Sequence, residues 1–153
     1  MTETDGLSDG EENGWDTVID EAEALGEEYR ENAWETLVVH PGDVTPLTGE
    51  LFGLSVLLPR SEYDAAAEFL SKADFDTTQV YRRASANMLV LIAVFEATDD
   101  RVALVVPSFV QGEEPELRAQ ATREGELPLQ LRALSAEERL VFTIADPSLV
   151  FES

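Results

Sequence analysis

One apolar tract constrains the fold of this chain more than any other feature of the sequence. It runs from Ala86 to Val110, ANMLVLIAVFEATDDRVALVVPSFV, and the polar segment Thr98–Arg101 divides it into two arms. Two arms of strand length around a short polar turn favour a β-hairpin over a buried helix. Apolar side chains fall on both faces of each arm, so we expect other elements to cover both faces of the hairpin.

The segments around this tract predict three helices, five further strands and a final helical turn from Asp146. Apolar residues at spacings of three and four predict a helix over Trp15–Ala33. Ser61 is expected to cap a second helix, while Pro115 and Gly125 mark the ends of a third. The further strands are expected at Glu35–Val39, Leu51–Leu58, Asp76–Ala84, Leu127–Ala133 and Leu140–Ile144.

The predicted fold class is α+β, a mainly antiparallel sheet of five to seven strands with three packed helices in the order α-β-β-α-β-β-β-α-β-β-α. The connections Ser85–Asn87 and Thr98–Arg101 are too short for parallel crossovers. Pro128 lacks an N–H, so its strand is expected at a sheet edge. Residues 1–13 are acidic and poor in apolar side chains, which predicts a disordered tail before a single domain at 14–153.

The net charge of the chain points to an unusual solvent. There are 32 Asp and Glu residues against 10 Lys and Arg, for a formal charge of −22, and Lys72 is the single lysine. Such a surface suits either a basic partner or a solvent of concentrated salt. At roughly 1 M salt the Debye length is only about 3 Å, so repulsion between carboxylates is screened. The near-absence of lysine favours the salt explanation.

One stretch of the chain also resembles a known family. The segment Trp34–Val44, WETLVVHPGDV, follows an acidic helix and precedes the strand LFGLSVLLP. In this arrangement the chain is similar to a small uncharacterised family of haloarchaeal cytoplasmic proteins, and the similarity covers most of the chain after Trp15. The resemblance implies a halophilic cytoplasm as the setting, and it implies no particular activity.

Several classes of site lack the residues they need. The chain has no cysteine, which rules out disulfides and thiolate chemistry. It shows neither a glycine-rich phosphate loop nor metal-ligand spacing, so we expect no cofactor and no metal. No apolar run approaches the ~20 residues that cross a membrane, and no basic face is present to bind nucleic acid. A cytoplasmic protein without membrane or nucleic-acid partners is therefore expected.

Two groups of residues are candidate binding sites. His40, the only histidine, precedes Asp43 by three positions and could act as a base oriented by that carboxylate, or it could bond locally within a type II turn. Tyr81, Arg82 and Arg83 contain the only adjacent basic pair in the chain. One arginine is expected to pair with helix carboxylates and the other to reach solvent beside Tyr81, where it could bind an anionic group.

The first predicted helix carries a candidate interface. Its apolar stripe is long, and Trp15 and Val18 at its start could contact a second copy or a protein partner, although simple packing on the sheet is the alternative. Two function classes follow. The leading one is a non-enzymatic binding or regulatory module of a halophilic cytoplasm, acting by protein contacts or dimerisation. The other is a small hydrolase or transferase with a carboxylate or arginine site between helix and sheet.

The charge generates a prediction about stability. Raising KCl from near zero to molar concentration should raise the thermal midpoint of unfolding steeply, because salt screens the repulsion that a charge of −22 creates in the folded state. The measurement is thermal unfolding followed by circular dichroism across that range. A midpoint that does not change would contradict the halophilic interpretation and favour the alternative that the acidic surface binds a basic partner.

Overall fold

The β-hairpin predicted from the apolar tract forms the centre of the structure. The computed structural model describes residues 7–84, 87–112 and 114–151. Strands β5 (Met88–Ala97) and β6 (Val102–Gln111) pair antiparallel over ten residues each, which confirms the hairpin. Alternate residues of β5 face opposite sides of the sheet and both sides are covered, as predicted.

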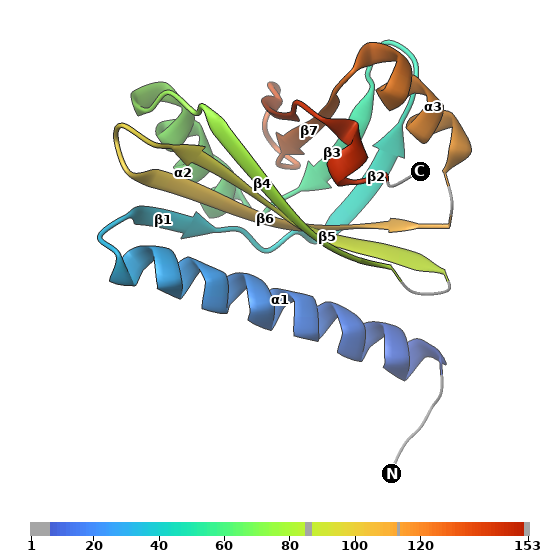
Figure 1. Cartoon of the computed structure of the whole chain (residues 1–153), viewed down its shortest axis with the longest axis horizontal. Coiled ribbons are helices and arrows are strands. Elements are labelled where there is room, and N and C mark those ends of the chain that lie inside the picture. Colours follow the sequence, from blue (N-terminus) through green and yellow to red (C-terminus); the bar gives the residue numbers. More distant parts are fainter. Residues whose placement is uncertain (1–6, 85–86, 113, 152–153) are drawn as a thin grey trace.

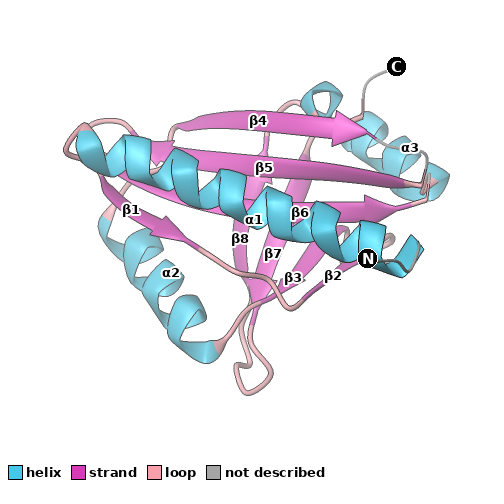
Figure 2. Cartoon of the chain, turned by 90° about the horizontal axis from the view of Figure 1, so that it is seen from below, coloured by secondary structure: helices cyan, strands magenta, loops and turns pink. Residues whose placement is uncertain are grey.

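Eight strands form two mixed four-stranded sheets in the described part of the chain. The strand order is β1-β6-β5-β4 in sheet A and β2-β3-β7-β8 in sheet B. The strands of the two sheets run across one another (Figure 2). The remaining strands are β1 (Glu35–Val38), β2 (Asp43–Leu47), β3 (Gly53–Leu57), β4 (Thr77–Ala84), β7 (Leu127–Arg132) and β8 (Leu140–Ile144).

Sheet A is the middle layer of the molecule (Figure 1). Helix α1 (Leu7–Glu31) lies across one of its faces, and sheet B packs on the other. Helices α2 (Arg60–Lys72) and α3 (Pro115–Glu124) lie on the side of sheet B, as does the 3-10 turn η1 (Pro147–Leu149). The third expected helix and the final helical turn are therefore confirmed.

Two separate clusters hold the layers together. The larger lies between the sheets and includes Leu54, Leu91, Leu104 and Leu129, which are almost fully buried. The smaller joins α1 to the outer face of sheet A, and its buried members are Val18, Ala22, Val38, Ile92, Val94, Ala103 and Val105. The acidic face of α1 is left toward solvent, as the amphipathic pattern predicts.

The α+β class is confirmed, but the single sheet of five to seven strands is not, because the described residues form eight strands in two sheets. Four of the six strand pairs are antiparallel, and two are parallel, β1 with β6 and β3 with β7. Each parallel pair joins strands that are far apart in the sequence, so no turn signal reports them. The strand β2 was not predicted, because its proline and its threonine interrupt the apolar alternation and the segment reads as a loop.

Pro128 does not mark a sheet edge. It lies in β7, which is flanked by β3 and by β8. The ladder with β3 begins only at Leu129, opposite Leu54, so the missing N–H of Pro128 falls before that ladder starts. The adjoining Gly53 has φ +130°, and a Cβ there would lie 2.2 Å from the carbonyl oxygen of Pro128. The glycine therefore lets the two strands approach.

The ends of two helices also differ from expectation. Helix α1 begins at Leu7, inside the segment predicted to be disordered, and acidic residues at a helix N-terminus interact favourably with its dipole. Residues 1–6 of that segment lie outside the described residues, as do residues 85–86 of the predicted turn. Helix α2 begins one residue before Ser61, and no side chain caps it.

Close packing of α1 on β1 generates a prediction at Gly26. A Cβ at this position would lie 2.4 Å from Cγ2 of Val38, a buried side chain of β1. Gly26→Ala gains about 1 kcal/mol of helix propensity, but overpacking costs about 1–3 kcal/mol. We expect a net loss of roughly 1 kcal/mol of unfolding free energy, measured by denaturant titration.

Two controls separate packing from helix propensity. Adding Gly26→Ala to a Val38→Ala background should stabilise the protein, because the clashing methyl group is gone. Gly42→Ala should be close to neutral, since nothing lies within 4 Å of a Cβ there. A stabilising Gly26→Ala in the wild-type background would contradict the close approach of α1.

Candidate functional site

His40 joins three elements of the structure. It lies between β1 and β2, and its Nδ1 is 2.6 Å from Oε2 of Glu62 on α2. Its Nε2 bonds to Glu23 on α1, and its backbone N–H donates to Glu62 at 2.6 Å. Asp43 takes no part, since it accepts from the hydroxyl of Thr45 at 3.0 Å. The expected pair of His40 with Asp43 is therefore replaced by contacts with two glutamates.

The two carboxylates change the protonation of His40. Burial by itself lowers the pKa of the imidazole, but the hydrogen bonds and charges of Glu62 and Glu23 outweigh it and hold the pKa above its usual value. A protonated ring donates from both nitrogens, which matches its two acceptors. Gly42 has no positive φ, so the predicted type II turn is absent as well.

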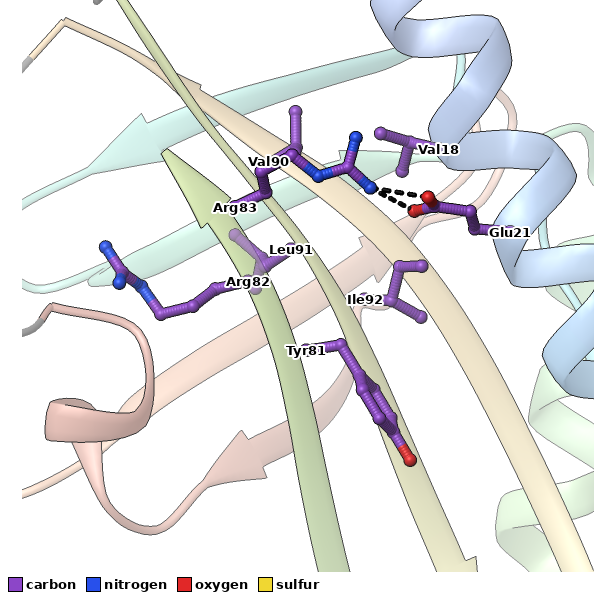
Figure 3. A pocket seen from close by; sticks show the side chains of 8 residues that line it. All are labelled: Val18, Glu21, Tyr81, Arg82, Arg83, Val90, Leu91 and Ile92. Carbon is purple, nitrogen blue, oxygen red and sulfur yellow. Dashed lines mark hydrogen bonds and ion pairs between the residues drawn. The ribbon is translucent and has the colours of Figure 1, made fainter. Parts of the chain in front are cut away.

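The basic pair on β4 is divided between the two faces of the strand (Figure 3). Arg83 bonds to both carboxylate oxygens of Glu21 on α1, which confirms the expected pairing with a helix carboxylate. Arg82 points to the opposite side, where its Nε donates to the carbonyl oxygen of Val150 at 3.0 Å. Tyr81 shares the face of Arg83, so Arg82 does not stand beside Tyr81 as expected.

The two candidate interface residues have different surroundings. Val18 is 1% exposed in the cluster beneath α1, so its side chain belongs to the interior and cannot meet a partner chain. Trp15 is only partly buried, and its ring meets Phe109 edge to face at 5.2 Å. It lines a recess of about 380 Å³ with Phe109, Pro41 and Met88.

A hydrogen-bonded chain of four side chains contains a buried carboxylate, that of Glu96. Glu96, on the α1 face of β5, is 8% exposed. Its Oε2 accepts from the hydroxyl of Tyr29 and from Nε2 of Gln79 at 3.1 Å. Gln79 in turn accepts from the hydroxyl of Tyr81 at 3.2 Å. Burial and the bond to Glu96 raise the pKa of Tyr29, so its hydroxyl keeps its proton and donates.

Three of these side chains line a recess between the end of α1 and sheet A. We name it the aromatic recess, and its volume is about 340 Å³. Its walls carry three aromatic rings, two amides and two charged groups. The residues that line it are Leu25, Glu28, Tyr29, Asn32, Trp34, Gln79, Tyr81 and Arg101.

Backbone geometry after α1 positions the rings of the recess. Ala33 adopts a left-handed conformation with φ 70°, which reverses the chain so that the N–H of Trp34 donates to the carbonyl of Tyr29 at 3.0 Å. The two rings then meet edge to face at 5.4 Å. The guanidinium of Arg101 lies 5.7 Å from the centre of the Trp34 ring. The recess is thus built from α1, β4 and the turn between β5 and β6.

A comparison with protein families shows which family the chain belongs to. The model of a family of unknown function, DUF7529, matches residues 3–152. The chain belongs to this family. No curated protein and no solved structure matches the chain. The membership extends over nearly the whole sequence and assigns no role to any residue.

Two further findings bear on the kind of site. Among the described residues, no helix combines the length and the apolarity needed to cross a membrane. Within the same part of the chain, no group of three or more His, Asp or Glu residues is placed to hold a metal ion. The imidazole nitrogens of His40 are both occupied by carboxylates, which fits that finding.

Sequence reasoning selected Tyr81 but missed Tyr29, Gln79, Trp34 and Arg101 as members of one site. These residues are far apart in the chain; Tyr29 and Glu96, for example, are separated by 67 positions. The one available signal was Glu96 itself, a single carboxylate within the apolar strand MLVLIAVFEA. A charge in such a strand is costly unless it is bonded or used.

The His40 cluster generates a prediction about pH. Because the folded pKa lies above the unfolded value, the stabilisation is fully present below about pH 6.5 and is lost as the pH rises through the folded pKa. His40→Gln should cost about 1 kcal/mol at low pH, a modest value because the cluster is partly exposed, and almost nothing at high pH.

The measurement is denaturant unfolding at a series of pH values in constant high salt. Asp43→Asn is the matched control and should leave the pH profile of the wild type unchanged, since Asp43 does not contact the ring. A profile that stays parallel between wild type and His40→Gln at all pH values would contradict the role of the two glutamates.

Proposed function

We propose that the chain is a non-enzymatic interaction module that associates with a second copy of itself through the outer edge of β4, in a solvent of concentrated salt. The observation that carries the proposal is the position of β4 at the end of sheet A. Among the described residues, its eight positions pair with β5 alone. An edge of this length presents backbone donors and acceptors on which another strand can add.

The sequence of β4 supports pairing with a second copy. It reads TTQVYRRA and holds two arginines and no acid, in a chain with 32 acids. Antiparallel pairing centred on Val80 keeps both copies of α1 on the same face of the joined sheet. It sets Thr78 opposite Arg82 and Thr77 opposite Arg83, so no two like charges meet across the strands. A closed two-fold pair of this kind covers the β4 edge of each copy.

The charge of the chain explains why salt belongs to this proposal. Two copies that each carry −22 repel one another in dilute buffer, and a Debye length of only a few ångströms removes most of that repulsion. The strand β4 is where two copies can approach with the least repulsion, because its own charges are positive. The proposed dimer therefore forms more readily as salt increases.

Matched charge substitutions at Thr78 test the proposal. Thr78→Arg places an arginine opposite Arg82 in each half of the pair, whereas Thr78→Glu places a carboxylate there. Each cross-strand pair contributes about 0.2–1 kcal/mol and occurs twice, so each variant should change the dimer affinity by roughly twofold to thirtyfold, in opposite directions. Sedimentation equilibrium in constant high salt measures the affinity, and thermal unfolding checks that both variants fold.

A third variant separates this edge from the interface expected at Trp15. If Trp15→Glu dissociates the dimer while both Thr78 variants leave it unchanged, the interface lies at the start of α1 and not at β4. A wild-type protein that stays monomeric at every concentration and salt tested would overturn self-association altogether.

A further inference from the structure

The aromatic recess has the composition of a small-molecule site, which goes beyond the pairing of β4. Its volume of about 340 Å³ lies in the range of ligand clefts, and its walls combine aromatic rings with a few polar groups. Tyr29 and Trp34 of the recess come from the end of α1, whereas Gln79 and Tyr81 come from the edge strand β4. The recess thus adjoins the proposed pairing edge, and the test below measures ligand binding with and without pairing.

Glu96 supplies negative charge immediately behind the wall of the recess. Both of its donors, Tyr29 and Gln79, line the recess and are uncharged. No described Arg, Lys or His forms an ion pair with Glu96, whose side chain is 8% exposed. A largely buried carboxylate without a cation is costly to keep, so the position suits a cation that arrives with a ligand. Glu28 adds a second carboxylate on the wall.

Arg101 supplies positive charge on the same recess. Its guanidinium stands 5.7 Å from the centre of the Trp34 ring, and in the described part of the chain it forms no ion pair with a carboxylate. Other bases nearby are paired, as Arg83 is with Glu21 and Arg30 with Glu27. In a chain with 32 acids, an arginine that meets only a ring is placed to receive an anionic group from outside.

Backbone strain is concentrated beside these groups. Within the described residues, three that are not glycine have positive φ: Ala33, Arg101 and Glu114. Arg101 lines the recess, and Ala33 immediately precedes Trp34, which also lines it. Left-handed conformations of such residues cost free energy and persist where the surrounding structure requires them, often at binding sites. Here they hold the indole and the guanidinium in place.

We infer that the aromatic recess binds a small zwitterion, an α-amino acid with an apolar or aromatic side chain. The ammonium group is directed to Glu28 on the wall, where the charge of Glu96 behind Tyr29 and Gln79 adds to the attraction. The carboxylate is directed to Arg101, and the side chain to the rings of Tyr29, Trp34 and Tyr81. A ligand with a single charge would satisfy one end of the recess and leave a like charge facing it at the other. A zwitterion satisfies both ends.

Three ligands that share one ring test this assignment. They are L-phenylalanine, 2-phenylethylamine, which keeps only the ammonium group, and 3-phenylpropanoate, which keeps only the carboxylate. Titration calorimetry and the fluorescence of the indole groups should detect L-phenylalanine, with each single-charge analogue weaker by roughly tenfold or more. Equal binding of the amine or of the acid would overturn the zwitterion, and no binding of any of the three would overturn the site.

Substitutions locate the binding within the recess. Glu28→Gln and Arg101→Asn should each lower the affinity by roughly tenfold to a hundredfold, since each removes the charge that faces one end of the ligand. Glu96→Gln should lower it by a smaller factor, because it removes the negative charge behind the wall. Asparagine tolerates the left-handed backbone at Arg101, and Glu96→Gln should keep or raise the thermal midpoint because it removes a buried charge. Tyr81→Phe should keep the affinity, because the ring remains.

Arg83→Gln is the matched control for charge. Arg83 lies on the same face of β4 as Tyr81 but outside the recess. The affinity of the Arg83→Gln variant for L-phenylalanine should therefore equal that of the wild type. The titrations are repeated with Thr78→Arg, which should weaken the dimer. The affinity of this variant for L-phenylalanine should equal that of the wild type, so a failure of the dimer proposal and a failure of the ligand site can be told apart. Loss of binding in Arg83→Gln equal to that in Arg101→Asn would overturn the assignment, because it would reflect total charge and not the recess.

Discussion

The antiparallel pairing of β5 with β6 is the interaction on which the rest of the structure depends. Ten residues of each strand are in register, and seven of them in β5 and eight in β6 are buried. A hairpin that is apolar on both faces is unstable in water until both faces are covered. Helix α1 covers one face and sheet B covers the other, so the order of the layers follows from this one pair of strands.

The acidic composition determines which ion pairs connect the outer elements of the structure. Bases are scarce, and several of them connect elements that are distant in sequence, as Lys72 does with Glu35 and Arg83 with Glu21. His40 has the same role with two acids at once. Partly exposed pairs of this kind contribute little one by one, so apolar burial carries the fold and the charges set its dependence on salt and pH.

At the end of α1, the apolar contacts between the helix and sheet A are replaced by hydrogen bonds between polar side chains. The cluster beneath the helix is apolar through Val94 and Val105, and the next β5 residue on that face is Glu96. A carboxylate at this place orients Tyr29 and Gln79 and leaves a recess beside them instead of a closed core. The free edge of β4 lies alongside, which brings the two proposed modes of binding to one side of sheet A.

Local patterns in the sequence determined most elements of the protein. Alternation and spacing predicted the central hairpin, the three helices and the strand that became β4, because those patterns depend on neighbours a few residues away. Composition likewise determined the acidic surface. The pairing of Arg83 with a helix carboxylate followed from strand geometry and the excess of acids, although its partner Glu21 could not be named in advance.

Only the tertiary structure decided how those elements combine. The parallel pairs β1–β6 and β3–β7 join strands that no turn connects, so the division into two sheets left no local signal. The partners of His40 were equally undetermined, because among 32 acids the sequence cannot say which two meet one imidazole. Glu96 and Tyr29 meet across 67 positions, since a contact at that separation depends on the path of the whole chain.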